Sequence, residues 1–179
     1  MTPLDLVRLT PLIDRTSGRP ELTIGLIDGP VVMDHAELAN QHVREIPGNG
    51  SAVCTQANST ACLHGTFVAG ILSAKRGSVA PAICPNCTLL VRPIFAETTA
   101  ANGEMPSATP EELAQAILDC IDAGARVLNI SAALAQPSMK NERALGEALD
   151  QAARRGVIVV AAAGNQGTLG STAITCHPW

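Results

Sequence analysis

The stretch LTIGLID, from Leu22 to Asp28, is a short apolar run that ends in an acid. Three further strand-like runs follow it, with segments of helical spacing between them. The last runs are apolar without alternation, as expected for a parallel sheet that helices cover on both faces. The chain is therefore expected to form a three-layer α/β domain with a mainly parallel sheet and right-handed crossovers. The expected strands are 22–28, 88–94, 126–131 and 157–165.

Helix signals stand between the expected strands. The clearest begins at Thr109, which can cap a helix, with Pro110 in its first turn and Glu112 completing a capping box. Gly124 is expected to end that helix. The expected helices are 65–75, 109–124 and 141–156, and the polar segments 47–62 and 96–108 are expected to be exposed loops.

Composition excludes several classes of partner. The chain has 179 residues, 46% of them hydrophobic and 16% charged, which suits one domain with a core. Aromatic residues make up only 2% and the net charge is −4, so a nucleic-acid partner is not expected. No apolar run reaches membrane-spanning length and no signal-peptide core begins the chain. These features favour a cytoplasmic location, although six cysteines leave an extracellular one open.

Polar residues follow the expected strands, where functional groups gather in such sheets. Asp28, Ser131 and Asn165 each stand at or just after the end of a strand, and His64 begins a helix at the same rim. An acid that orients a histidine makes a general base, and an asparagine amide can donate to an oxyanion. Taken singly, the three suggest only a strand-end acid, a surface or capping histidine and a turn residue.

Three ordered blocks of sequence have a more specific resemblance. They are IGLIDGPV (24–31), HGTFVAGIL (64–72) and VVAAAGNQG (159–167), and they resemble signature blocks of the subtilisin-like serine proteases. The segments 77–95 and 127–135 resemble connecting and substrate-pairing parts of that family. The sequences LIDGPV and VRPIF are most similar to those of subtilases that cleave cyanobactin-type precursor peptides.

The resemblance implies a role for each matching residue. Asp28 would orient the base, His64 would be the base and Asn165 would donate to the oxyanion, while Gly65 allows close backbone approach. A peptide substrate would bind extended, as an added strand. The residues expected to flank its P1 side chain are Ser131, Ala132, Ala133, Ala161, Ala162, Ala163 and Gly164.

The sequence also departs from the family pattern. The family's nucleophile lies in a Gly-Thr-Ser block tens of residues beyond the asparagine, whereas 14 residues follow Asn165 and the only later serine is Ser171. Ala133 stands where the family usually has glycine. Residues 22–179 are therefore expected to form the N-terminal two-thirds of a catalytic domain, after an N-terminal extension or helix over 1–21. A C-terminal segment or second chain would supply the serine.

Two consequences and two alternatives accompany this interpretation. The isolated chain is expected to be inactive, and its uncovered apolar face is expected to bind a complementing chain or to self-associate. The first alternative is an inactive pseudo-protease that binds peptides, although retention of all three site residues argues against it. The second is a nucleotide-binding α/β domain, which is disfavoured because no glycine-rich phosphate motif follows any strand.

The cysteines carry a separate set of expectations. CPNC (84–87) is half of a zinc knuckle without its other half, so a local disulfide, or two quiet thiols, is favoured over zinc. Cys54 and Cys62 bracket a polar loop and are expected to pair, and Cys120 is expected to be a buried thiol. No metal, calcium or cofactor is expected. His35 and His42 are expected to be surface residues.

Overall fold

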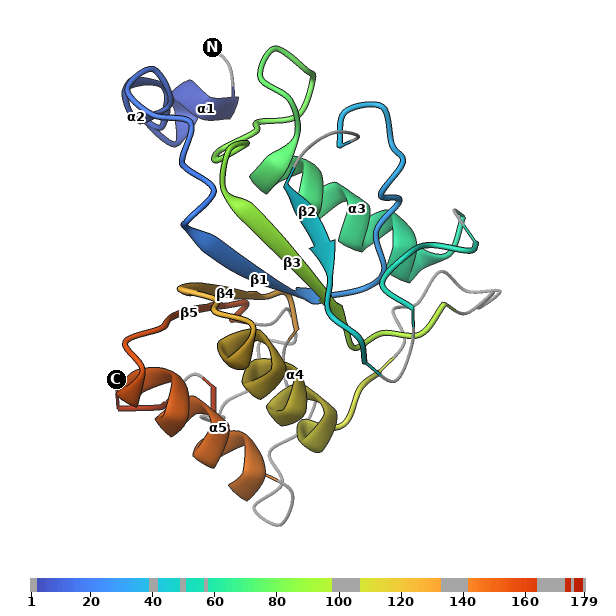
Figure 1. Ribbon diagram of the computed structural model, residues 1–179, viewed down its shortest axis with the longest axis vertical. Helices are drawn as coiled ribbons and strands as arrows, with labels where there is room; N and C mark the ends of the chain where they lie inside the picture. The colour runs from blue at the N-terminus through green and yellow to red at the C-terminus, as the bar shows by residue number, and fades with distance from the viewer. Residues whose placement is uncertain are drawn as a thin grey trace.

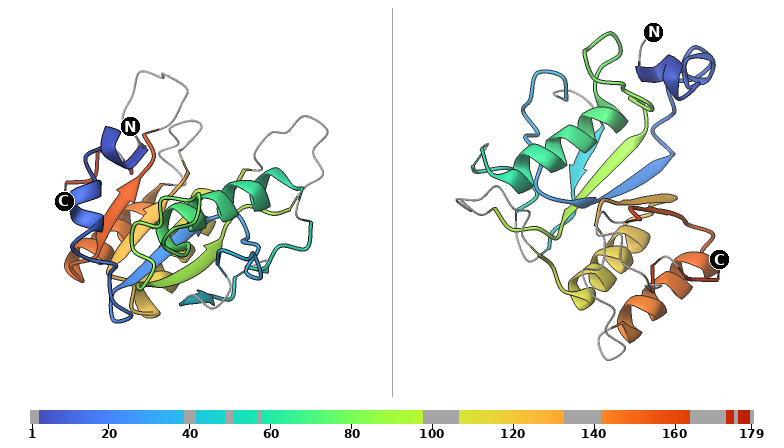
Figure 2. Two further views of the ribbon diagram at one scale, coloured as in Figure 1. Left: turned by 90° about the horizontal axis from the view of Figure 1, so that it is seen from above. Right: turned by 180° about the vertical axis from the view of Figure 1, so that it is seen from behind.

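The computed structural model consists of one sheet with helices packed on both of its faces (Figures 1 and 2). The structure describes residues 3–38, 42–48, 51–56, 58–97, 107–132, 142–163, 173–174 and 176–178. The strands are β1 (Thr23–Asp28), β2 (Val43–Glu45), β3 (Thr88–Pro93), β4 (Val127–Ile130) and β5 (Ile158–Ala161). The helices are α1 (Pro3–Leu6), α2 (Thr10–Ile13), α3 (Thr60–Ser73), α4 (Pro110–Asp122) and α5 (Arg143–Arg154).

The five strands pair in the order β2-β3-β1-β4-β5, and every pairing is parallel. The predicted three-layer α/β fold is therefore confirmed. In the middle of the sheet, Ile24 of β1 lies between Leu89 of β3 and Val127 of β4. The sequence analysis missed β2, because this strand of three residues lies at the edge of the sheet and two of them are exposed.

Both faces of β1 are buried, which explains its unbroken apolar sequence. Ile24 and Leu26 belong to a core cluster on the α3 side of the sheet. Ile27 points the other way and belongs to the cluster formed with α4 and α5. Because successive side chains alternate across a strand, β1 needs apolar residues throughout when helices lie on both sides.

The cap, the first-turn proline and the terminating glycine predicted for α4 are confirmed. The hydroxyl of Thr109 accepts a hydrogen bond from the backbone N–H of Glu112 at 3.1 Å, and Pro110 is the first helical residue. Gly124 follows the helix with φ of +89°, a conformation that favours glycine.

The predicted start of α3 is wrong. The helix begins at Thr60 rather than at residue 65, so His64 is its fifth residue and does not open it. Ser59 is the N-cap, and its hydroxyl accepts a hydrogen bond from the N–H of Cys62 at 3.2 Å. The segment 47–62 was expected to be loop because it is rich in Ser, Asn and Thr, but those residues also cap helices.

One part of the sheet has no cover among the described residues. Val157 and Val159 pack toward the cluster made with α4 and α5. Ile158 and Val160 point to the opposite face and are 63% and 52% exposed. Helix α3 lies on that face but packs against β1, so it leaves β5 open. In the described part of the chain, no helix is long and apolar enough to cross a membrane.

Candidate active site

The carboxyl end of the central strand carries a fully buried acid. Asp28 is the last residue of β1, and its side chain has no solvent exposure. Its Oδ1 accepts a hydrogen bond from the backbone N–H of Gly29 at 2.6 Å. Its Oδ2 is buried and has no hydrogen-bond partner within the part of the chain that the structure describes. A buried carboxylate is costly unless it is paired, so this acid has to be matched by a cationic or donor group.

That group is His64, in the second turn of α3. Its Nδ1 lies 2.8 Å from Asp28 Oδ1, while the side chain as a whole is 40% exposed. The imidazole is thus bonded at Nδ1 to a buried carboxylate and is still accessible from outside. In this geometry the carboxylate fixes the tautomer with the proton on Nδ1, which leaves Nε2 free to accept a proton.

Two glycines hold α3 close enough for this contact. A methyl group at Gly65 would lie 2.5 Å from the carbonyl oxygens of Gly29 and Pro30, and one at Gly29 would overlap the backbone of Ala61. The close backbone approach predicted at Gly65 is confirmed. The hydroxyl of Thr66 also accepts a hydrogen bond from the N–H of Val32 at 3.0 Å, which ties the same turn to the segment after β1.

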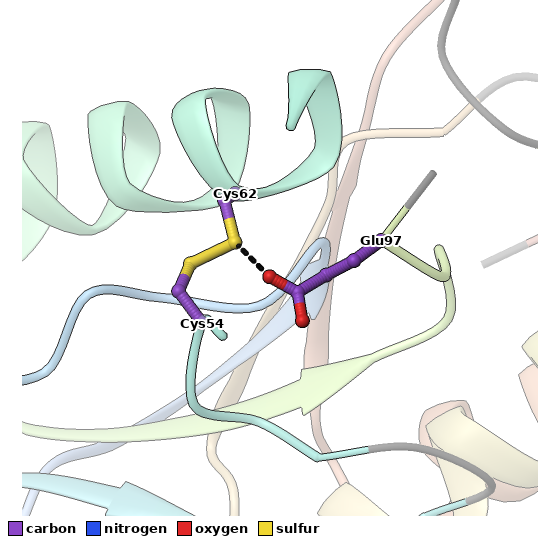
Figure 3. A group of neighbouring side chains, drawn as sticks. All are labelled: Cys54, Cys62 and Glu97. Atoms are coloured by element: carbon purple, nitrogen blue, oxygen red, sulfur yellow. Dashed lines mark hydrogen bonds between the residues drawn. A yellow bond between two sulfur atoms is a disulfide. The ribbon is translucent and has the colours of Figure 1, made fainter. Parts of the chain in front are cut away.

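The start of α3 is held from a second side by a disulfide. Cys54 and Cys62 are bonded, as predicted, and their Cα atoms lie 5.8 Å apart. The carboxylate of Glu97, just after β3, lies against this disulfide (Figure 3). Burial opposes ionisation of Glu97, but hydrogen bonds from Thr55 and Gln56 outweigh it and hold the pKa of that carboxyl below its ordinary value.

Sequence reasoning missed Glu97. It falls in the segment 96–108, which was treated only as an exposed loop. The available signal was its position a few residues beyond the carboxyl end of β3, at the rim where Asp28 ends β1. The role of Gly29 was missed as well, since the amino-acid sequence does not show that Gly29 packs against the backbone of Ala61.

Of the seven residues expected to flank a substrate, the five that the structure describes lie at the same rim. Ser131 and Ala132 follow β4 and are half-buried, and Asn129 donates a hydrogen bond from Nδ2 to Ser131 Oγ at 2.8 Å. Ala161, at the end of β5, and the two residues after it, Ala162 and Ala163, are exposed. Because β1, β4 and β5 are neighbours in a parallel sheet, these segments and Asp28 share one edge. Three expected residues, Ala133, Gly164 and Asn165, lie outside the described residues.

Of the two alternatives left open for CPNC, a local disulfide or two quiet thiols, the structure shows the second, because Cys84 and Cys87 are both free thiols. They pack with the core cluster on the α3 side, and a methyl group at Gly18 would overlap the sulfur of Cys87. Burial, with the neighbouring Cys87, raises the pKa of Cys84 to about 12. Oxidation requires a thiolate, so Cys84 stays protonated, and both residues behave as part of the core. Cys120 is a buried free thiol, as predicted.

Known proteins match this chain in sequence and in fold. The Peptidase S8, or subtilase, family model matches residues 19–176. Mycosin-4 of Mycobacterium tuberculosis is 31% identical over 157 residues, which are 82% of this chain and 34% of mycosin-4. A mutant of the protease domain of PatA superposes with a TM-score of 0.75 at 27% identity, over 84% of this chain and 52% of that one.

The prenylagaramide maturation protease PagA has a TM-score of 0.72 at 26% identity, over 89% of this chain and 52% of its own. The chain thus spans about a third of the length of mycosin-4 and about half that of the two proteases of known structure. The resemblance predicted from the three sequence blocks is confirmed. Because the family match begins before β1 and extends past β5, the chain belongs to the subtilase family.

Proposed function

We propose that this chain supplies the acid and the base of a subtilisin-type serine endopeptidase. The observation that carries the proposal is the 2.8 Å contact between Asp28 Oδ1 and His64 Nδ1 at the carboxyl end of the central strand. Family membership supports a catalytic role for this contact, because an aspartate and a histidine activate a serine in subtilases. The fully buried acid and the partly exposed base suit those two roles.

The proposed steps follow from the properties of the two side chains. His64 Nε2 takes the proton of a serine hydroxyl while the serine oxygen attacks the peptide carbonyl carbon. The imidazolium that forms is stabilised by the ionised Asp28 beside it. The same proton then passes to the leaving amine as the C–N bond breaks, which leaves an acyl-enzyme. A water activated by His64 hydrolyses that ester and restores the serine.

Asn165 is proposed to donate its side-chain amide to the oxyanion of both tetrahedral intermediates. Its position after β5 suits this role, since the carboxyl ends of β5 and β1 face the same rim. Loss of such a donor costs roughly 3–4 kcal/mol of transition-state stabilisation, a magnitude established on subtilisin itself. The loss appears mainly in kcat.

The serine is proposed to come from a segment outside these 179 residues, either a continuation of this chain or a second polypeptide. The uncovered side of β5 supports this, because Ile158 and Val160 are 63% and 52% exposed on the face that also carries α3. A complementing segment that packs there would bury both side chains and could bring a serine to the rim.

The proposed substrate is an extended peptide, with precursor peptides as the class. Ser131 to Ala133 and Ala161 to Gly164 would hold its main chain and border the P1 side chain. PagA, which shares 26% identity with this chain, is a prenylagaramide maturation protease, and this supports the choice of precursor peptides.

Active-site labelling tests the proposal. The chain carrying an N-terminal affinity tag is purified from its native source with whatever copurifies, and is treated with a biotin-linked fluorophosphonate. We expect the labelled serine to lie outside residues 1–179, and recombinant 1–179 to remain unlabelled. His64→Ala should lower labelling and peptide cleavage by several orders of magnitude.

His42→Ala is the matched control, because His42 is exposed and precedes β2, whose first residue pairs with Leu89, whereas Asp28 pairs with Pro93 at the other end of β3. This variant should leave both rates unchanged. A labelled serine within residues 1–179 would contradict the proposal. Peptide binding without labelling in any preparation would instead identify a pseudo-protease that only holds peptides.

A further inference from the structure

Three side chains from separate segments meet at the start of α3, the helix that carries the candidate base (Figure 3). Cys54 belongs to the loop before α3, Cys62 to the first turn of α3, and Glu97 to the segment after β3. Cys62 is fully buried, whereas Cys54 is half-buried. Cys62 precedes His64 by two positions in the same helix, so the disulfide is attached to the helix that carries the imidazole.

Glu97 holds the loop through hydrogen bonds that do not involve sulfur. Its carboxylate accepts from the backbone N–H of Gln56 at 2.7 Å, from the backbone N–H of Thr55 at 2.9 Å, and from the Thr55 hydroxyl. These hydrogen bonds connect the loop to the segment after β3 in addition to the disulfide.

The contact between Glu97 and Cys62 differs between the two oxidation states. Cys62 Sγ lies 2.7 Å from Glu97 Oε1. A disulfide sulfur carries no hydrogen, so in the oxidised state this contact sets a carboxylate oxygen against a sulfur without a bridging proton. In the reduced state the Cys62 thiol can donate its hydrogen to the same oxygen, which is a charge-assisted hydrogen bond.

We propose that the Cys54–Cys62 disulfide is a reversible redox switch beside the candidate base, and that Glu97 favours its reduced state by accepting a hydrogen bond from the Cys62 thiol. The proposed thiol–disulfide exchange depends only on the positions of Cys54, Cys62 and Glu97. Only its effect on peptide cleavage rests on the proposed function.

The reductant is a dithiol, and its thiolate attacks the accessible sulfur, Cys54. The Cys54–Cys62 bond breaks, its electron pair passes to Cys62, and that sulfur takes up a proton. The second thiol of the reductant then attacks the reductant sulfur of the mixed disulfide and releases Cys54 as a thiol. Two electrons and two protons move from the dithiol to the cysteines, and the reductant leaves as a cyclic disulfide.

A redox titration of the full chain tests the switch. The folded protein is equilibrated with mixtures of reduced and oxidised dithiothreitol, the thiols are trapped with N-ethylmaleimide, and peptide mapping by mass spectrometry reports Cys54 and Cys62 separately from the four free cysteines. We expect reduction without denaturant and the same midpoint from both directions.

Glu97→Gln keeps an acceptor for the loop but removes the charge. A hydrogen bond to a neutral acceptor is about half as strong as one to a carboxylate, so half-reduction should need roughly a tenfold higher ratio of reduced to oxidised dithiothreitol. Glu45→Gln is the control, since Glu45 Oε1 also accepts a hydrogen bond from this loop, at the N–H of Ala52, and this contact does not involve either sulfur. Its midpoint should match that of the unchanged chain.

Two results would overturn the proposal: a folded chain that resists dithiothreitol entirely, or equal midpoints for the unchanged chain and Glu97→Gln. Urea unfolding of both glutamine variants confirms that each is folded. In the native preparation, reduction should lower fluorophosphonate labelling severalfold in the unchanged chain and have no effect in a Cys54→Ser, Cys62→Ser double variant. Absence of labelling in every form would contradict the proposed function, while the midpoints would still decide the switch.

Discussion

The two halves of the rim differ in how far this chain completes them. At the end of β1, Asp28 is fully buried, bonded to His64 and enclosed by backbone-to-backbone packing at Gly29 and Gly65. At the end of β5, the last strand residue Ala161 and the two that follow are exposed. Asp28 finds its hydrogen-bond partners within the chain, except that its Oδ2 has none among the described residues. The end of β5 instead presents an exposed face and edge of the sheet.

The two ends of the rim therefore depend on different contacts. The geometry of Asp28 and His64 depends on contacts within the chain and should persist when the chain is studied alone. The part that would hold a substrate carbonyl and a nucleophile depends on whatever covers β5.

The largest effect is expected from Gly65→Ala. The added methyl group would lie 2.5 Å from two backbone carbonyl oxygens, which cannot move without displacing α3 from β1. We expect a loss of about 3 kcal/mol in the free energy of unfolding, measured by urea denaturation, or failure to fold seen by circular dichroism. Gly146→Ala in α5, where nothing lies within 4 Å of the added carbon, should instead stabilise by about 0.5–1 kcal/mol. Equal effects at the two sites would refute the packing argument.

The next effect concerns the open half. Replacing Ile158 and Val160 by lysine should weaken self-association of the isolated chain by on the order of 100-fold, because two exposed apolar side chains leave the contact surface. Sedimentation velocity measures this. Val159→Ala faces the cluster made with α4 and α5, so it should lower stability and leave association unchanged. Elution of the unchanged chain as a lone monomer would count against the open face as a contact surface.

A smaller effect distinguishes the buried thiols from the exposed one. Burial raises the pKa of Cys84 and of Cys120 to about 12, so neither forms much thiolate at pH 8. We expect iodoacetamide to modify both at least tenfold more slowly than the exposed Cys176. Mass spectrometry of tryptic peptides over time gives the rates. Rapid modification of Cys84 would show that the α3-side core is open there.

The smallest effect is a pH dependence from Glu97. Its folded pKa is depressed, so its hydrogen bonds to Thr55 and Gln56 contribute stability above the unfolded pKa, and that stability is lost as pH falls through the folded pKa. For a group at the surface we expect less than about 1 kcal/mol. Urea midpoints measured between pH 7 and pH 3 should fall more for the unchanged chain than for Glu97→Gln. A steeper fall in the variant would reverse the assigned sign.

Much of the layered fold could be predicted because its signals are local. The unbroken apolar sequence of β1 required cover on both faces, and Thr109, Pro110 and Gly124 gave the limits of α4 within a residue or two. The pairing of Asp28 with the α3 histidine was inferred from motif order, and the structure places their side chains 2.8 Å apart.

What could not be predicted depends on contacts between distant segments. Strand β2 forms because β3 offers it a partner, since its own three residues have no apolar pattern. The start of α3 was missed because Ser59 suits a loop as well as a cap. The state of Cys84 and Cys87 stayed open between a disulfide and two thiols, because spacing alone does not show that both residues pack with the core. Glu97 gains its role only from the loop that folds against it.

The central place of β1 has a consequence for the order of folding. β1 is the first strand in the chain, yet its two neighbours, β3 and β4, come much later and are separated from it by helices. Neither neighbour can pair with it until a long intervening segment has been closed into a loop, which makes such topologies slow to fold. The chain must therefore keep its central strand unpaired until β3 and β4 have been made, and we expect its refolding rate to be set by loop closure rather than by helix formation.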